Sequence, residues 1–299
     1  MQRLVWRFML SISNLEKTYE NGVKALDDVT LNIPKGLFGL LGPNGAGKSS
    51  LMRTIATLQS ADAGSIVFDQ LDVLNQPNEL RSRLGYLPQS FGVYPRISAI
   101  DLLDHLAILK GIVNRGERRE VVNGLLARTN LYQHRKLAVS GFSGGMKQRF
   151  GIAQALIGDP DLLIVDEPTA GLDPEERNRF HNLLIELGEN KVIILSTHIV
   201  DDVSELCPKM AILASGKILL EGNPISLITS LNNNIWQKTV AADELLELQN
   251  ELAVISTRLM AGKTMVHVLS ESAPEGFQST LVDLEDVYFS TLYNHRSAA

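Results

Sequence analysis

The chain has 299 residues, 44% of them hydrophobic, and a net charge of −6. This length predicts about two domains, or one large domain and a small one, with ample material for a core. The acidic balance argues against a general electrostatic footprint for nucleic acid. The one cysteine, Cys207, excludes an intrachain disulfide, and we expect it to be a small buried apolar side chain.

No apolar run approaches the roughly 18 residues that a membrane-spanning helix needs. The first ten residues contain two arginines, and their apolar run is too short for a signal peptide. We expect this stretch to be an extension, with the folded domain beginning near Leu10. A role at a membrane would therefore depend on a partner.

Short apolar runs in the first ninety residues predict strands. Asn21-Gly22 is a strong turn signal between the first two of them. After the third strand, the pattern predicts a helix with Leu51, Ile55 and Leu58 on one face. The expected strands are residues 10–15, 25–33, 37–41, 65–68 and 84–87, and the helix is residues 50–58.

The stretch between the third strand and this helix fits the phosphate-binding pattern G-x-x-x-x-G-K-[ST]. Gly45 and Gly47 can turn backbone N–H groups inward, and these donors bind an anion together with the helix N-terminus. Lys48 adds a charge for the β- and γ-phosphates, and Ser49 adds a hydroxyl for Mg²⁺. A turn that binds nothing is disfavoured, because every fixed position is present between a strand and a helix. The predicted nucleotide-binding residues here are Gly42, Pro43, Asn44, Gly45, Ala46, Gly47, Lys48, Ser49 and Ser50.

From about residue 90 to residue 142, helical periodicity replaces the strands and predicts a small helical insertion. Ser98 and Asp101 give the first of its helices a start signal. An α/β core resumes after Ser143, where alternating strands and helices imply a largely parallel sheet. The expected helices are residues 99–109, 116–128, 144–157 and 175–187, and the expected strands are residues 162–165, 192–195, 210–213 and 217–220.

Beyond residue 222 the composition shifts, and we expect a small α+β appendage that carries no recognisable chemical motif. Its helices are expected at residues 225–231, 243–252 and 284–293. Its strands are expected at residues 235–240, 254–259 and 265–269.

Two carboxylates end the apolar strand at residues 162–165, at the edge of a parallel sheet where ligands bind. Asp166 is expected to hold Mg²⁺, directly or through water. Glu167 is then free to act as a general base toward an attacking water. Acidic residues often end strands at a surface without any function, but the phosphate-binding loop upstream favours the functional interpretation.

Three further sites are candidates for nucleotide contact, because the phosphate-binding loop and the two carboxylates already predict a nucleotide site. Gln89 follows a strand and precedes the insertion, so it can reach the γ-phosphate or Mg²⁺. His198 ends the strand that should lie beside the catalytic one, which favours a γ-phosphate contact over a merely satisfied polar residue. Ser143, Gly144 and Gly145 open a helix and form a second anion cradle, which makes sense if it caps a nucleotide held by another copy.

Together these motifs resemble the ATP-binding subunit of an ABC transporter, in the right order over residues 10–222. The resemblance assigns the adenine-stacking role to Tyr19, the D-loop to residues 170–173 with Asp173, and the switch histidine to His198. Gly42–Ser49 then corresponds to the Walker A motif, Gln89 to the Q-loop, Ser143–Met146 to the signature and Leu162–Glu167 to the Walker B motif.

This resemblance implies an α/β fold: a P-loop NTPase core with a mainly parallel sheet and an antiparallel β subdomain. A helical subdomain of about residues 90–142 would interrupt an ATP-binding domain of residues 10–222, and residues 223–299 would form an accessory or regulatory domain. The implied cofactors are ATP and Mg²⁺, and the implied activity is ATP hydrolysis that powers export or rearrangement of a substrate.

The implied partners are a second ATP-binding subunit, expected to be another copy of this chain, and a separate membrane permease; no nucleic acid is expected. Each nucleotide would lie between Lys48 of one copy and Ser143 of the other. The subunit would be peripheral on the cytoplasmic face of the membrane. We expect the permease to dock in a groove between the core and the helical insertion, near Gln89–Ser98. This stretch is rich in apolar side chains, although they could instead pack the insertion onto the core. They are Phe91, Val93, Tyr94, Pro95 and Ile97.

The signature departs from its usual form, because Phe142 and Met146 replace the outer Leu and Gln. Met146 removes an amide that could contact the ribose, while the Ser-Gly-Gly centre remains. The run Ser143–Arg149 and the C-terminal Leu284–Phe289 resemble the export branch whose permeases are separate subunits.

Two competing classes are less well supported. A soluble ABC-type ATPase acting on ribosomes or DNA usually has two cassettes or long coiled-coil insertions, whereas this chain has one cassette and no sustained heptads. A P-loop GTPase would need an Asn-Lys-x-Asp motif, which the sequence lacks. The sequence names neither the substrate nor the permease.

Overall fold

The computed structural model describes residues 9–92, 95–169, 171–241, 244–260 and 262–297. A six-stranded sheet in the order β10-β9-β3-β8-β7-β6 forms its centre, and all neighbours are parallel except β10 and β9. The strands are β3 (Gly36–Leu41), β6 (Leu84–Leu87), β7 (Leu162–Asp166), β8 (Val192–Thr197), β9 (Lys209–Ala214) and β10 (Lys217–Gly222). The predicted parallel core is confirmed.

A second, antiparallel sheet has the order β2-β1-β4-β5. Its strands are β1 (Met9–Thr18), β2 (Lys24–Pro34), β4 (Ala63–Phe68) and β5 (Leu71–Asp72). Alternating apolar residues of β1 and β2, such as Leu10, Ile12 and Leu31, share one buried cluster with Phe38 of the central sheet. Helix α1 (Lys48–Ile55) contributes Leu51 to the same cluster and is held between the two sheets.

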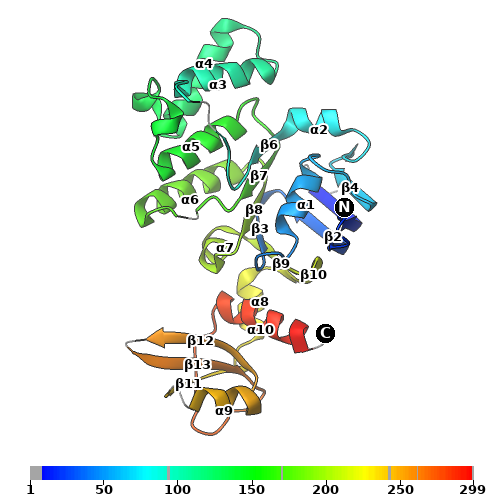
Figure 1. Cartoon of the computed structure of the whole chain (residues 1–299), viewed down its shortest axis with the longest axis vertical. Coiled ribbons are helices and arrows are strands. Elements are labelled where there is room, and N and C mark those ends of the chain that lie inside the picture. Colours follow the sequence, from blue (N-terminus) through cyan, green and yellow to red (C-terminus); the bar gives the residue numbers. More distant parts are fainter. Residues whose placement is uncertain (1–8, 93–94, 170, 242–243, 261, 298–299) are drawn as a thin grey trace, which may run out of the picture.

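Helices cover the rest of the central sheet and build the insertion. Figure 1 shows α3 and α4 at one end of the molecule and the sheet of the C-terminal part, described below, at the opposite end. Ser98 caps α3 as predicted, because its Oγ accepts a hydrogen bond from the backbone N–H of Asp101 at 3.2 Å. These helices are α2 (Pro77–Arg83), α3 (Ala99–Leu109), α4 (Arg115–Arg128), α5 (Gly144–Ala155), α6 (Pro174–Gly188) and α7 (Val200–Leu206), with single 3₁₀ turns η1 (Tyr132–His134) and η2 (Val139–Gly141).

The C-terminal part contains a third sheet in the order β12-β13-β11-β14, with antiparallel pairing throughout. In the described part of this region, a small hydrophobic cluster of Val240, Val266, Val268 and Phe277 lies inside the sheet. Its elements are α8 (Pro224–Ser230), β11 (Ile235–Val240), α9 (Glu244–Glu251), β12 (Val254–Met260), β13 (Lys263–Leu269), β14 (Gln278–Ser279) and α10 (Leu284–Ser297).

Helix α10 packs on the central core as well as on this third sheet. Leu284, Val287 and Leu292 belong to the same buried cluster as Leu195 of β8 and Ile212 of β9. The appendage is therefore joined to the core through a shared hydrophobic cluster, and a division of the chain after residue 222 stays a prediction.

The structure also shows the burial and packing of several side chains discussed above. Cys207 is 5% exposed, as predicted, and burial raises the pKa of its thiol. Phe91 and Ile97 are partly buried and pack against the hydrophobic cluster of the helical insertion, which contains Ala99, Leu103 and Val122. Phe91 also packs against the cluster of the central sheet, which favours for this residue the alternative that it fixes the insertion to the core. Pro95 is exposed, and a docking role for this stretch stays a prediction. Residues 1–8, Val93 and Tyr94 lie outside the described residues.

Candidate active site

The phosphate-binding loop joins β3 to α1 with two glycines in left-handed backbone conformations. Gly45 has a φ of 80°, and Gly47, which is the N-cap of α1, has a φ of 109°. A Cβ atom on Gly47 would stand 2.3 Å from the carbonyl oxygen of Ala25, so no larger residue fits there. The sequence predicted that these glycines adopt conformations open to glycine, and the positive φ angles agree with that prediction.

Lys48 is buried at the start of α1, with 6% of its surface exposed. Its Nζ donates to the carbonyl oxygens of Gly42 at 2.6 Å and Pro43 at 3.2 Å, and lies 4.0 Å from Oε1 of Glu167. Burial lowers the pKa of Lys48, against the opposing pull of the carboxylates of Glu167 and Asp166. A bound triphosphate would give this ammonium the anionic partners that the loop itself does not supply.

Ser49 and Asp166 come together as the prediction of a shared Mg²⁺ site requires. The Oγ of Ser49 lies 3.5 Å from Oδ2 of Asp166, which is 4% exposed at the end of β7. Burial raises the pKa of Asp166, so a cation beside it would favour the ionised form. One hydroxyl and one carboxylate suit Mg²⁺, which usually takes one or two protein ligands together with phosphate oxygens and water. The described residues contain no cluster of three or more His, Cys, Asp or Glu that would hold a metal alone.

Glu167 is the point at which the polar residues of three neighbouring strand ends converge. Its Oε2 accepts a hydrogen bond from Nε2 of Gln89 at 3.0 Å, and its Oε1 lies 3.2 Å from Nδ1 of His198. Gln89 follows β6, Glu167 follows β7 and His198 follows β8, and these strands are adjacent in the sheet. Gln89 and His198, which are distant in sequence, are thereby brought to the carboxylate of Glu167.

The backbone of Glu167 adopts an uncommon conformation, with a φ of 48°. Its N–H donates to the carbonyl oxygen of Ser196 on β8 at 2.8 Å, which holds this turn in place. Strained backbone of this kind persists where the surroundings determine it, and it occurs often at active sites.

A cavity of about 510 Å³ lies over the phosphate-binding loop. Tyr19 forms one side of it, and its hydroxyl lies 3.0 Å from Oγ of Ser50 and donates to Oε1 of Gln59 at 3.1 Å. The turn between β9 and β10 closes another side, where the N–H of Gly216 donates to the carbonyl oxygen of Ala46 at 2.9 Å. The sequence predicted a hairpin at this turn but gave no sign of its place at the site. The remaining lining residues include Val23, Lys24, Ala25, Pro43, Asn44, Gly45, Gly47, Lys48, Ser49, Gln89, Glu167 and Ser215.

Replacing Tyr19 by Ala should weaken nucleotide binding by about 1–3 kcal/mol, the range measured for one stacked base. The loss should be similar for ATP and GTP, because stacking uses the π-face that all bases share. Titration with a fluorescent nucleotide would measure it. Tyr19→Trp should bind almost normally, and Tyr19→Phe would separate the ring from its hydrogen bonds to Ser50 and Gln59. Unchanged affinity in Tyr19→Ala would make Tyr19 an ordinary surface residue.

The signature stretch lies elsewhere on the chain, at the N-terminus of α5. Ser143 caps this helix, with its Oγ accepting from the N–H of Met146 at 3.2 Å. Among the described residues that line the phosphate-loop cavity, none belongs to the signature. Phe142 is buried with its ring edge against Phe150, and Met146 packs against the insertion's cluster. Both departures from the usual signature therefore have a packing role within the single chain.

Asp173 caps α6, and its Oδ1 accepts from the N–H of Glu176 at 2.8 Å. Like the signature, it is not among the described residues that line the cavity. A contact between Asp173 and nucleotide therefore stays a prediction, and Ala170 of the same loop lies outside the described residues.

A glycine-rich loop between a strand and a helix, with carboxylates at the end of a neighbouring parallel strand, defines a nucleoside triphosphatase of the P-loop class. A model of the ABC transporter family matches residues 26–170. The ABC transporter ATP-binding protein NatA of Bacillus subtilis is 37% identical over 228 residues, which cover 74% of this chain and 92% of NatA. The chain belongs to the ABC transporter family and is an ATP-binding subunit that hydrolyses ATP for transport.

Other relatives include both an export protein and an import protein. The Nod factor export ATP-binding protein I of Cupriavidus metallidurans is 34% identical and covers 89% of this chain and 88% of that protein. A methionine import ATP-binding protein of Bacillus thuringiensis is 37% identical over 78% of this chain. The dimeric structure of the bacterial ABC transporter cassette MJ0796 superposes with a TM-score of 0.66 at 26% identity, over 72% of this chain and 98% of that one.

Proposed function

We propose that two copies of this chain bind two Mg-ATP head to tail and that hydrolysis drives export through a separate permease. The observation that carries the proposal is the convergence of Lys48, Gln89 and His198 on Glu167 beside a phosphate-binding loop. The signature in the same chain lies outside this cavity, which supports a role for it at the nucleotide of a second copy. The cassette MJ0796, which shares the fold, was solved as a dimer.

In this proposal the chain's own residues divide the work of hydrolysis. The loop amides and Lys48 hold the β- and γ-phosphates. Ser49 and Asp166 hold Mg²⁺, which when bound neutralises charge on the phosphates. Glu167 accepts the proton of the attacking water. Gln89 and His198 contact the two carboxylate oxygens of Glu167 and orient both this side chain and the water. Because the pKa of Asp166 is raised by burial, protons should compete with Mg²⁺ at a higher pH than at an ordinary aspartate.

Export rather than import is supported by the similarity to the Nod factor export protein along most of both chains. None of the helices in the described residues is long and apolar enough to cross a bilayer. We therefore infer a peripheral position on the cytoplasmic face of the membrane, held there by the permease.

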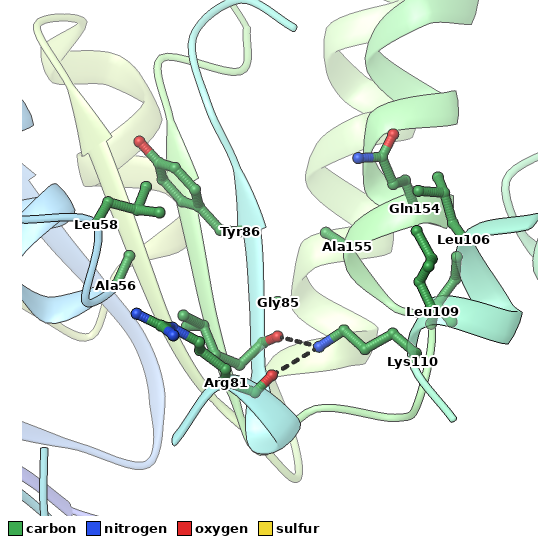
Figure 2. Close-up of a pocket in the computed structure, with 12 residues that line it drawn as sticks. Ala56, Leu58, Arg81, Gly85, Tyr86, Leu106, Leu109, Lys110, Gln154 and Ala155 are labelled. Carbon is green, nitrogen blue, oxygen red and sulfur yellow. Dashed lines mark hydrogen bonds between the residues drawn. The ribbon is translucent and has the colours of Figure 1, made fainter. Parts of the chain in front are cut away.

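The permease is proposed to dock in a groove of about 420 Å³ between the core and the helical insertion. Figure 2 shows Leu58 and Tyr86 on the core side of this groove and Leu106 and Leu109 on the insertion side. Leu58 and Leu109 are 61% and 70% exposed, so the groove has apolar rims open to a partner. At its base, Nζ of Lys110 donates to the carbonyl oxygens of Arg81 at 2.8 Å and Leu84 at 2.9 Å, which joins the insertion to the core.

The groove also lies close to the active site in the sequence, because Tyr86 precedes Gln89 by three residues on the same strand and loop. A partner seated there would contact the segment that reaches Glu167. This arrangement supports transmission of motion from the active site to the permease through the Gln89 loop. The sequence suggested a groove between the core and the insertion near Gln89–Ser98, and none of the described residues of that stretch is among those that line this groove.

Replacing Leu58 and Leu109 by Ser should abolish recovery of the subunit with membranes that contain its permease, while ATP hydrolysis in solution continues. Both side chains are exposed, so their loss should leave the fold intact. Leu281→Ser is the matched control, since Leu281 is 94% exposed on the appendage, away from the groove. Unchanged recovery of the double variant would place the docking surface elsewhere. A wild-type chain that never co-purifies with membranes would favour the ribosome or DNA alternative.

A further inference from the structure

A fully buried carboxylate, Asp202, lies outside the nucleotide cavity and collects donors from two other segments. It is 0% exposed in the first turn of α7, four residues after His198. It accepts a hydrogen bond from Oγ1 of Thr169, a second from Nε of Arg177 at 2.8 Å, and its Oδ1 lies 2.9 Å from Nε2 of His181. Buried carboxylates are costly unless they are paired in this way.

The three donors come from the two segments that follow the catalytic carboxylates. Thr169 is 3% exposed and stands two residues after Glu167. Arg177 and His181 lie one turn apart on α6, so they present their side chains on the same face. One carboxylate therefore ties the loop after β7, the helix α6 and the helix after His198 together.

The donors around Asp202 stabilise its ionised form. Burial raises the pKa of Asp202, but the hydrogen bonds from His181 and Thr169 and the charge of Arg177 outweigh it, so the pKa lies below its ordinary value. The other ring nitrogen of His181, Nδ1, lies 3.1 Å from Oε2 of Glu205.

The two catalytic side chains contact each other, and Gln89 also donates to Glu167. Glu167 and His198 both stand on turns just beyond strand ends, and His198 is 46% exposed. The strained backbone of Glu167 also needs surroundings that determine it. Among the described residues, the hydrogen bond from Glu167 to Ser196 and the one from Thr169 to Asp202 both join the loop after β7 to the segment around His198.

We propose that Asp202 is a positioning residue for hydrolysis, which holds the Glu167 loop against the His198 turn. Its carboxylate fixes Thr169 and, through α7, the backbone on which His198 stands. The 3.2 Å separation between His198 Nδ1 and Glu167 Oε1 is maintained by this link. The inference rests on the roles proposed above for Glu167 and His198.

The test compares steady-state hydrolysis and nucleotide affinity in paired variants. Thr169→Val and Asp202→Asn should lower kcat by roughly 10–100-fold, because misplacement by about 1 Å costs about that much. Affinity for ATP should stay within error of the parent, because neither residue touches the phosphate-binding loop. Thr169→Ser keeps the hydroxyl and should stay close to normal. Asp201→Asn is the matched control, since it removes an exposed carboxylate one residue earlier on the same helix.

Thermal melts of each variant identify the temperature at which all of them are folded, and kcat is compared there. If Thr169→Val and Asp202→Asn then hydrolyse ATP normally while Glu167→Gln does not, Asp202 has no positioning role. Equal losses in Thr169→Ser and Thr169→Val would also overturn the inference, because the hydroxyl would not matter. Normal turnover in Glu167→Gln would instead remove the proposed role of Glu167 itself.

Discussion

Glu167→Gln should bind Mg-ATP normally and lose most of its turnover. A positioned general base contributes roughly 10²–10⁴-fold to the rate, and glutamine has nearly the same shape but cannot take the proton. The substitution leaves Lys48, Ser49 and the loop amides in place, so the affinity for nucleotide should not fall. The expected result is thus a loss of kcat by at least two orders of magnitude.

Phosphate release at saturating Mg-ATP measures this loss, and light scattering measures its consequence for assembly. Because the variant cannot hydrolyse its way out of the closed state, a nucleotide-bound dimer should accumulate. Glu189→Gln is a matched control, since Glu189 is exposed at the C-terminal end of α6 and is not among the described residues that line the cavity. Near-normal turnover in Glu167→Gln would show that another residue is the base.

Lys48→Ala should weaken ATP binding itself. Lys48 is the buried cation nearest to where the β- and γ-phosphates are expected, and removing one partner of such a buried charged contact costs roughly 2–5 kcal/mol. In the structure its ammonium is held by two neutral carbonyl groups, so the truncation removes few contacts that the fold requires. Equilibrium titration with a nucleotide analogue measures the affinity, and equal affinity in parent and variant would count against the phosphate-binding interpretation.

Mixing this variant with a Ser143→Arg chain tests the head-to-tail arrangement. Each variant alone should be inactive, but a mixed dimer has one site built from an intact Lys48 and an intact Ser143. Random pairing gives half mixed dimers with one intact site each, hence roughly a quarter of the normal rate. Ser143 is not among the described residues that line the chain's own cavity, so the Ser143→Arg copy should still bind ATP. A mixture that stays inactive would contradict a shared site.

The sequence predicted most of the fold, because its signals are local. The glycines of the phosphate-binding loop, the strand that ends in Asp166 and the capping serines at 98 and 143 each reflect a conformation of a few residues. Helices α2 and α7 escaped prediction, because seven residues give a weak period, although α8 of the same length was predicted. Strands β5 and β14 have two residues each and leave no pattern at all.

The rest of the site depends on contacts between distant segments. Asp202 and Thr169 are 33 residues apart, and nothing in either stretch marks a buried pair. Phe91 looked like an exposed apolar residue because a loop pattern does not show what packs over it, and here both the core and the insertion do. The turn at Ser215-Gly216 reaches the nucleotide cavity only because β9 lies beside β3.

The packing of α10 also bears on how the chain folds during its synthesis. Domains tend to fold from the N-terminus as they leave the ribosome. Here the cluster beneath β8 and β9 is completed by Leu284, Val287 and Leu292, which are made about ninety residues after β8. Until α10 emerges, the apolar side chains that it covers remain open to water and to chaperones. The cluster that α10 shares with the nucleotide-binding unit can therefore be completed only after α10 has been synthesised.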